Sequence, residues 1–379
     1  MQDLATSREQ IDVIDRKIVH LFEERMVLSN EVAAYKKATN KPVYDPIREQ
    51  EKLEKLQSMA STDFNKEAVE ELFTQIMSLS RKYQYREIHP KAEIYSFQMY
   101  EKFPMDQNTK VCFFGPPGTH TQQAMMDFFG KDIKGISAPT FQSVMDQVEQ
   151  EAADFGVLPI ENSSTGGITA NYDLLLDKNV YIVGEYIRPI TQSLMGLPGA
   201  SFEKATKVYS HPQGLMQCAR FLSQYPNLQQ IPCESTADAA KKVREMGDPA
   251  ALAIAAPVAA HVYNLEILKD SIQQEQSNAT RFIIIHHKPF YQKDSNKLAL
   301  CFELKHECGS LYRTLSHFQF NHLNLSLIES RPIKEKNWEY RFFVDVEGNL
   351  LDPGVQNALR GIKDDAKKLM ILGNFKAIT

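Results

Sequence analysis

Two cationic side chains interrupt an apolar stripe near the amino terminus. Apolar residues recur at three- and four-residue steps across positions 11–35, as on one face of a helix. Arg25 and Lys36 fall on that face, and at about 100° per residue they project within roughly 20° of each other. Because a buried charge without a partner is costly, two interpretations stay open. Either carboxylates of the protein pair with these cations in structural salt bridges, or the cations line a pocket shaped for a small dicarboxylate.

Long helices must position these cations. The sequence has no glycine before Gly115, and the apolar period predicts a first helix of about 33 residues and about 50 Å. Two shorter helices are expected over residues 47–59 and 66–85, and Ser80 and Gln84 continue the apolar face of the latter. Two short helices cannot cover so long a stripe, so we expect it to pair with a second copy of the chain.

Four polar clusters in the middle of the chain each follow or precede a short apolar run. They occupy residues 115–121, 161–167, 210–217 and 278–281. Glycines let a backbone approach a ligand, and the free N–H groups of a helix start attract anions. Because ligand sites of α/β domains form beyond strand ends, the clusters are expected to converge on one cleft. Structural alternatives stay open for the first three clusters, which are a tight turn, a Ser or Thr helix cap, and a structural histidine, in that order.

The elements around these clusters change character along the chain. From residue 110, short apolar runs alternate with helical patterns, which predicts an α/β domain with largely parallel sheets. The last 85 residues or so follow a strand, helix, strand, strand, helix, strand order, which predicts a ferredoxin-like α+β module. The predicted boundaries are 1–90 for the helical domain, 91–107 for a linker, 108–288 for the α/β domain and 296–379 for the α+β module.

Bulk properties exclude several classes of protein. A chain of 379 residues predicts two or three domains. The net charge of −5 gives no reason to expect nucleic acid or an anionic membrane as a partner, and neither a membrane span nor a leader pattern is present. Five cysteines without a C-x-x-C pair are read as reduced thiols in the cytoplasm. No metal-ligand spacing or nucleotide-binding loop occurs, so we expect no cofactor.

Residues 4–88 resemble an all-helical chorismate mutase domain of three helices that form an intertwined dimer. Residues 7–12, 24–25, 35–37 and 42–51 carry the match. The resemblance implies a pericyclic rearrangement of chorismate to prephenate, which requires a held conformer and charge stabilisation and no nucleophile. It implies the site residues Arg8, Arg25, Lys36, Asp45, Arg48, Glu49, Ser80 and Gln84.

Roles within that set follow from residue chemistry and the resemblance. The three arginines would clamp the two substrate carboxylates, because bidentate pairing is strongest there. Lys36 and Gln84 would face the ether oxygen as donors. The remaining residues would orient the substrate hydroxyl and the cations, and Arg8 would be lent to the pocket of the partner subunit.

Residues 108–288 resemble the prephenate dehydratase family. The match is carried, in the family's order, by Gly-Pro-x-Gly-Thr at 115–119, Pro-Ile-Glu-Asn-Ser at 159–163, Ser-His-Pro-Gln at 210–213 with Gln-Cys at 217–218, residues 234–240 and 253–255, and Asn-x-Thr-Arg-Phe at 278–282. The resemblance implies two lobes around a cleft, similar to periplasmic solute-binding proteins. It also implies loss of hydroxide and carbon dioxide from prephenate to form phenylpyruvate.

This resemblance places Thr280 at the departing hydroxyl, with its proton relayed or its hydrogen bond shared with neighbours. The implied substrate-binding residues are Thr119, Asn162, Ser163, Ser210, His211, Gln213, Gln217, Thr280 and Arg281. Arg281 is a candidate anion partner, with structural pairing as its alternative. Glu161 is either a general acid or, as we favour, a residue that stabilises the helix start.

The carboxy-terminal module resembles the phenylalanine-binding ACT domain of these enzymes. The implied ligand residues are Gly309, Ser310, Leu311, Glu329, Ser330, Arg331 and Pro332. The first motif departs from the family pattern, which usually has Ala in place of Ser310 and Val in place of Tyr312. ACT modules pair side by side and bind the amino acid at the interface. A dimerising module without a ligand is the alternative.

Taken together, the chain resembles bifunctional chorismate mutase/prephenate dehydratases of phenylalanine biosynthesis. The resemblance implies an isomerase and a lyase in one chain, with chorismate and prephenate as substrates, feedback inhibition by L-phenylalanine, and a homodimer or a tetramer. Two rival hypotheses remain. One is a ligand-binding protein with degenerate helices, which would bind phenylalanine without turnover. The other is a monofunctional dehydratase whose helices serve only to dimerise.

Overall fold

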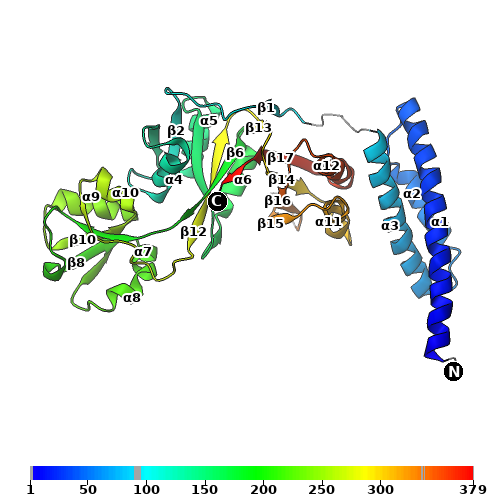
Figure 1. Cartoon of the computed structure of the whole chain (residues 1–379), viewed down its shortest axis with the longest axis horizontal. Helices are drawn as coiled ribbons and strands as arrows, with labels where there is room; N and C mark the ends of the chain where they lie inside the picture. The colour runs from blue at the N-terminus through cyan, green and yellow to red at the C-terminus, as the bar shows by residue number, and fades with distance from the viewer. Residues whose placement is uncertain (1–2, 89–94, 334–335, 337, 379) are drawn as a thin grey trace. The chain divides into compact units, whose positions relative to one another are not determined.

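The computed structural model describes residues 3–88, 95–333, 336 and 338–378 (Figure 1). The chain divides into two compact units, Met1–Ser96 with Cys301–Met370, and Phe97–Leu300 with Ile371–Thr379. The expected linker over residues 91–107 lies partly outside the described residues, because 91–94 are not among them. No helix within the described ranges is long and apolar enough to span a bilayer.

The first unit begins with three helices, as predicted. They are α1 (Leu4–Thr39), α2 (Pro46–Gln57) and α3 (Asp63–Ile88). The first ends at Asn40, whose left-handed backbone (φ 51°) donates its N–H to the Lys36 carbonyl. The second begins at the N-cap Asp45, whose side chain accepts from the Arg48 N–H, with Pro46 in the first turn.

The apolar stripe of α1 stays uncovered within one chain. Only Ser29 and Ala33 of α1 are buried, whereas Ile14, Leu21 and Leu28 are 54%, 61% and 60% exposed. The carboxy-terminal half of α3 is mostly buried instead. Helix α1 therefore presents a long apolar face that the described residues of its own chain do not cover.

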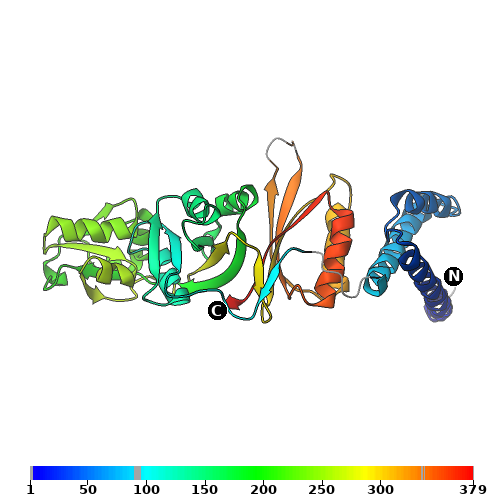
Figure 2. The ribbon, with the colours of Figure 1, turned by 90° about the horizontal axis from the view of Figure 1, so that it is seen from above.

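The carboxy-terminal segment has the βαββαβ order that the sequence predicts. Its elements are β14 (Lys297–Glu303), α11 (Ser310–Phe320), β15 (Leu325–Pro332), β16 (Tyr340–Glu347), α12 (Pro353–Asp365) and β17 (Lys368–Phe375). The strands lie side by side in the order β15-β16-β14-β17, and both helices cover one face of them (Figure 2).

The second unit contains two lobes, each built around one main sheet. The elements of the first lobe are β2 (Lys110–Phe114), α4 (His120–Phe129), β3 (Lys134–Ala138), α5 (Phe141–Glu149), β4 (Phe155–Asn162), β5 (Gly166–Gly167), α6 (Thr169–Asp177), β6 (Tyr181–Pro189) and β12 (Ala279–His286). The strand order is β6-β12-β4-β2-β3. Strand β12 runs antiparallel to both of its neighbours, so this sheet is mixed, where the sequence predicted largely parallel pairing.

The elements of the second lobe are β7 (Ser193–Gly196), η1 (Phe202–Lys204), β8 (Lys207–Ser210), α7 (Pro212–Gln217), α8 (Ala219–Leu222), β9 (Gln229–Pro232), α9 (Thr236–Met246), β10 (Ala251–Ala255), α10 (Pro257–Val262) and β11 (Glu266–Lys269). The strand order is β11-β7-β10-β8-β9, and β8, β9 and β10 are parallel. Three short strands complete the unit: β1 (Gln98–Tyr100), which pairs with β13 (Phe290–Gln292), and β18 (Ala377–Ile378), which pairs with β6.

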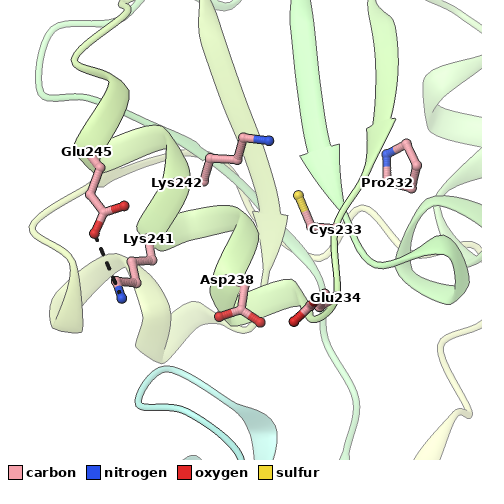
Figure 3. A pocket seen from close by; sticks show the side chains of 7 residues that line it. All are labelled: Pro232, Cys233, Glu234, Asp238, Lys241, Lys242 and Glu245. Carbon is pink, nitrogen blue, oxygen red and sulfur yellow. Dashed lines mark ion pairs between the residues drawn. The ribbon is translucent and has the colours of Figure 1, made fainter.

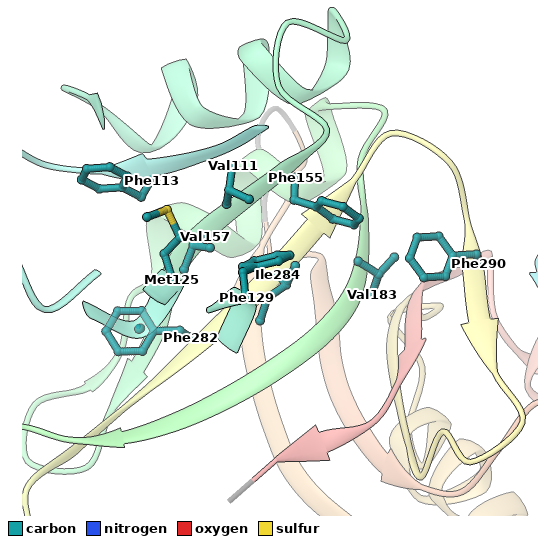
Figure 4. Packing of buried hydrophobic residues seen from close by; sticks show 11 residues of the cluster. Val111, Phe113, Met125, Phe129, Phe155, Val157, Val183, Phe282, Ile284 and Phe290 are labelled. Carbon is teal, nitrogen blue, oxygen red and sulfur yellow. The ribbon is translucent and has the colours of Figure 1, made fainter. Parts of the chain in front are cut away.

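The core of the first lobe determines which way β12 faces. Phe282 and Ile284 pack with Met125 and Phe129 of α4 in one buried cluster (Figure 4). Because side chains alternate along a strand, Thr280 lies on the same face as Phe282 and Ile284. The aromatic core thus orients the strand that carries Thr280.

Two chain segments cross between the lobes. The first segment follows β6 and leads into the second lobe. The second segment precedes β12 and leads back to the first lobe. Backbone hydrogen bonds join them, from Ile190 N to Asn278 O at 2.8 Å and from Ile272 N to Gln192 O at 2.9 Å. The paired crossings place the ends of β4, β6 and β12 near the connection to the second lobe.

Candidate active sites

A cavity of about 750 Å³ opens among α1, α2 and α3. Its lining contains seven of the eight predicted mutase residues, which are Arg25, Lys36, Asp45, Arg48, Glu49, Ser80 and Gln84. Residues from three helices and the loop after α1 thus meet in one place. The cavity is rich in cations, as a dicarboxylate site requires.

The two cations of the apolar stripe contact neutral groups. Arg25 Nη1 donates to Ser80 Oγ, and Lys36 Nζ donates to the Val43 carbonyl at 2.6 Å and to Gln84 Oε1 at 3.4 Å. Neither forms an ion pair with a carboxylate of the described residues. Burial lowers the pKa of both side chains. The geometry therefore favours the pocket interpretation over structural salt bridges.

The polar residues of α3 are held in place by neighbours. Gln84 is 7% exposed, and its Nε2 donates to Ser29 Oγ at 3.1 Å, while Ser80 Oγ donates to the Ile76 carbonyl at 2.9 Å. Because the Gln84 amide is bonded at both ends, its orientation is set before any ligand binds.

Arg8 does not line this cavity. Arg8 precedes Arg25 on α1 by 17 residues, which places it roughly 25 Å from Arg25 along the helix axis at 1.5 Å per residue. A side chain cannot span that distance, so Arg8 cannot serve the pocket of its own chain.

The sequence interpretation missed Arg81. Its guanidinium forms an ion pair with the Glu49 carboxylate, lies 4.8 Å from the centre of the Tyr44 ring, and lines the cavity. A signal was present, because Arg81 follows Met77 by four residues and precedes Ile88 by seven, on the buried face of α3.

In the second unit, the register of β12 brings Thr280 opposite Asn162 of β4. Asn162 Nδ2 donates to Thr280 Oγ1 at 2.9 Å and to Asn278 Oδ1 at 2.9 Å. Thr280 is 8% exposed. Because its oxygen accepts this bond, the hydroxyl proton of Thr280 remains able to donate to another acceptor.

The loop after β4 is built around the other end of the same amide. Asn162 Oδ1 accepts from Ser164 N at 3.0 Å and from Ser164 Oγ at 2.7 Å. Ser163 Oγ accepts from Ala279 N at 2.9 Å. Two of the four predicted clusters, 161–167 and 278–281, are therefore joined by hydrogen bonds.

The cluster at residues 210–217 lies in the second lobe. Ser210 is fully buried and its Oγ donates to the Ile254 carbonyl at 2.7 Å. His211 caps α7, with Nδ1 accepting from Gln213 N at 3.2 Å. Gln217 Oε1 accepts from Gln192 Nε2 at 3.1 Å, which ties α7 to the first crossing segment. Ser210 and His211 both have structural partners here.

The turn at residues 115–119 contacts the second lobe. Thr119 caps α4 by accepting from Gln122 N, which is the helix-cap alternative for this residue. Tyr263 Oη donates to the Pro117 carbonyl at 2.7 Å. Gly118 has φ 91°, and a Cβ there would lie 2.9 Å from the Tyr263 ring. This position therefore requires glycine twice over, for its backbone conformation and for the close approach.

Arg281 pairs with the protein's own carboxylates. It contacts Glu161 at 3.2 Å and the fully buried Glu185 at 2.9 Å, and Lys297 also pairs with Glu185 at 2.6 Å. Alternation along β12 directs Arg281 to the face opposite Thr280. The arrangement favours structural pairing as the role of Arg281, in place of substrate binding, and it engages Glu161 in the same network.

A separate hollow of about 610 Å³ lies in the second lobe (Figure 3). It is lined by Pro232, Cys233, Glu234, Asp238, Lys241, Lys242 and Glu245. Its charges are mixed, and Lys241 pairs with Glu245 at 3.8 Å. None of the predicted substrate residues lines it.

The predicted phenylalanine motifs occupy two elements of the carboxy-terminal segment. Gly309 (φ 73°) is the N-cap of α11, and the range from Glu329 to Pro332 forms the end of β15, the strand at the edge of the order given above. Tyr312 is 60% exposed. Its bulky ring therefore does not fill the interior of its own chain.

A cationic helical pocket and a two-lobed α/β domain in one chain define a multidomain enzyme. Residues 7–85 match the family "Chorismate mutase type II", and residues 111–290 match "Prephenate dehydratase". A bifunctional chorismate mutase/prephenate dehydratase of Aquifex aeolicus (strain VF5) is 36% identical over 99% of this chain and 98% of its own length. The counterpart of Stutzerimonas stutzeri is 30% identical over 98% and 97%.

A solved structure is also similar to this chain. The prephenate dehydratase of Arthrobacter aurescens in complex with L-Phe is 29% identical, with a TM-score of 0.65, over 71% of this chain and 90% of that one. This chain belongs to the bifunctional chorismate mutase/prephenate dehydratase family. The resemblance to bifunctional chorismate mutase/prephenate dehydratases is confirmed, and the chain is an isomerase and a lyase of phenylalanine biosynthesis.

Proposed function

We propose that the helical cavity rearranges chorismate through the eight residues predicted from the sequence. Arg25 and Arg48, with Arg8 of a second copy, bind the two carboxylates, and Lys36 and Gln84 donate to the ether oxygen as it gains charge. Asp45, Glu49 and Ser80 orient the hydroxyl and the cations. The observation that carries this proposal is that Arg25 and Lys36 are half-buried and bonded only to neutral groups among the described residues. Two such charges are available to a dianion.

The second copy in this proposal pairs through the stripe of α1. Two observations support it. The stripe is apolar and uncovered, and Arg8 lies too far along α1 to reach its own cavity. An intertwined pair of such helices would bury the stripe and bring Arg8 to the other chain's cavity. Two such dimers could associate as a tetramer.

For the dehydratase, the proposal makes Thr280 the donor to the departing hydroxide. The hydrogen bond from Asn162 to Thr280 supports it, because a hydroxyl that already accepts one bond is oriented to donate. Ser163 and Thr119 bind from the first lobe. Ser210, His211, Gln213 and Gln217 bind from the second lobe, and closure around prephenate would bring them to the substrate. Glu161 and Arg281 serve as structural supports.

The carboxy-terminal segment is proposed to be an ACT module that binds L-phenylalanine and inhibits the dehydratase. Its βαββαβ order and the L-Phe complex of the Arthrobacter aurescens relative support this assignment. We also retain the domain boundaries 1–90, 91–107, 108–288 and 296–379. The five cysteines are free, which supports a cytoplasmic location.

One assay tests the proposal. The purified chain is given chorismate, and chorismate loss and phenylpyruvate formation are followed at neutral pH, with an acidified parallel sample as a measure of spontaneous prephenate breakdown. The expected result is enzymatic formation of phenylpyruvate from chorismate. Conversion of prephenate alone would mean a monofunctional dehydratase. Phenylalanine binding without either conversion would mean a ligand-binding protein.

A further inference from the structure

The helical cavity is proposed to bind the dianion chorismate, yet a carboxylate of the protein lines it. Glu49 lines the cavity together with Arg25 and Lys36. Burial lowers the pKa of both cations, and the nearby charge of Glu49 is the largest influence that opposes this lowering. Glu49 is therefore close enough to both to weaken their attraction for a substrate carboxylate. An uncompensated negative charge at this point would oppose binding.

Arg81 compensates this charge from the opposite helix. Glu49 is in the first turn of α2, and Arg81 lies on α3, immediately after Ser80. The two form an ion pair in which the Arg81 side chain is 9% exposed and that of Glu49 is 23% exposed. The Tyr44 ring, 4.8 Å from the guanidinium, covers it. A planar cation stacked on a ring and paired with a carboxylate has little freedom to move.

Other carboxylates also act on Arg81. Burial raises the pKa of Asp364 of α12 to about 6, and the charge of Arg81 opposes this rise. The pKa of the neighbouring Asp365 is lowered despite burial, chiefly by its hydrogen bond to His317, and the charge of Arg81 adds to the lowering. Arg81 could therefore be a purely structural residue that helps α12 pack near α3. That role would be independent of Glu49, which provides a way to separate the two.

We propose that Arg81 is a positioning residue of the mutase site that neutralises Glu49 and holds its carboxylate as an acceptor for the substrate hydroxyl. The cavity then keeps one hydrogen-bond acceptor without presenting a net negative charge to a dianion. Arg25 and Arg48 then stay available for the substrate carboxylates, and Lys36 stays available for the ether oxygen. This inference rests on the proposed function of the cavity.

A double-mutant cycle between positions 81 and 49 tests the inference. Arg81→Leu, Arg81→Lys, Glu49→Gln and the double variant Arg81→Leu/Glu49→Gln are compared by kcat and KM for chorismate. Dehydratase turnover of prephenate in the same preparations reports whether the chain is intact. Arg86→Leu is the matched control, because Arg86 is an exposed arginine on α3 that pairs with its neighbour Glu87 at 3.5 Å and lies over the ring of Tyr83, away from Glu49.

We expect Arg81→Leu to raise KM at least about tenfold, from the uncompensated charge of Glu49. Arg81→Lys should recover most of the loss, and Arg86→Leu should match the wild type. In the Glu49→Gln background, Arg81→Leu should change KM by less than about threefold, because no charge is left to compensate. Equal KM changes in both backgrounds, or an unchanged KM in Arg81→Leu, would overturn the inference.

Two further outcomes are separable. If Arg81→Leu does not fold, Arg81→Gln replaces it in the same cycle, with the same expected pattern. If the wild type itself does not consume chorismate while its dehydratase is active, the proposed function of the cavity fails, whatever the variants do.

Discussion

The side-chain amide of Asn162 donates a hydrogen bond to the hydroxyl of Thr280 at 2.9 Å. The two residues are 118 positions apart and meet because β4 and β12 are adjacent antiparallel strands. The same amide donates to Asn278 and accepts from Ser164 at its other end. The Thr280 hydroxyl is therefore set as a donor by a group whose own orientation is fixed at several points.

Removing the Thr280 hydroxyl should abolish most dehydratase turnover. We expect Thr280→Ala to retain no more than a few per cent of wild-type kcat, because a lost donor at developing charge costs about 10²–10³-fold. Thr280→Ser keeps the hydroxyl and should retain substantial turnover. Mutase turnover by the same samples is the control. A Thr280→Ala enzyme with more than a few per cent of the activity would remove Thr280 from the mechanism.

Lys36→Ala and Gln84→Ala should each abolish most mutase turnover and leave dehydratase turnover intact. Both side chains line the helical cavity and are joined by a hydrogen bond of 3.4 Å. Loss of one donor to a charged oxygen is worth roughly 10²-fold or more in kcat. Chorismate and prephenate assays on each variant check this, and wild-type mutase rates in either variant would contradict the assignment.

As the pH is raised, mutase activity should fall at a lower pH than the pKa of an ordinary lysine would predict. Burial lowers the pKa of Lys36 below its usual 10.5, with Glu49 and Asp45 opposing and Arg48 and Arg81 adding to the effect. The active form is the protonated ammonium, so activity is present below this pKa and is lost as the pH rises through it. Measurements of kcat/KM for chorismate across the alkaline pH range follow this decline, which is the alkaline limb of the pH profile.

Lys36→Arg provides the control for that profile. An arginine stays charged throughout this range, so any activity that remains in the variant should no longer decline with the Lys36 limb. An identical alkaline limb in the wild type and in Lys36→Arg would assign the titration to another group.

Arg281→Met should destabilise the second unit more than it weakens prephenate binding. The substitution removes one of the two cations that pair with the fully buried Glu185 and leaves Lys297 in place. Removing one member of a buried ion-pair network costs about 3 kcal/mol of unfolding free energy. Denaturant unfolding and the KM for prephenate separate the two roles. Lys376→Met, which breaks an exposed pair with Asp294, is the control and should change little. A stable variant with a much raised KM would restore Arg281 to the substrate set.

L-phenylalanine should raise the thermal unfolding midpoint of the chain by a few degrees at saturation, because a ligand bound only by the folded state stabilises it. D-phenylalanine is the stereochemical control. Tyr312 is exposed, so Tyr312→Val, which restores the usual residue of the motif, should strengthen the shift at low ligand concentration. If L-phenylalanine shifts the unfolding midpoint of neither the wild type nor Tyr312→Val, the carboxy-terminal segment is a dimerising module that binds no ligand.

Local pattern was enough to predict much of this molecule. The period of the first helix puts Arg25 and Lys36 on one face, because both belong to one continuous helix whose geometry relates them. The order of the carboxy-terminal elements and the glycine-rich turn before α4 follow from equally local signals. The motifs that carry the family resemblance are also short stretches of consecutive residues.

Partners remote in sequence were decided only by the tertiary structure. Whether Lys36 met a carboxylate or a carbonyl depended on the path of the loop that brings Val43 back to α1. The pairing of Arg81 with Glu49 required α2 and α3 to pack together. Arg281 found Glu185 because β12 is inserted between β4 and β6, which no local period encodes. Helical geometry fixes neighbours a few residues apart, whereas strand order and loop paths depend on packing of the whole chain.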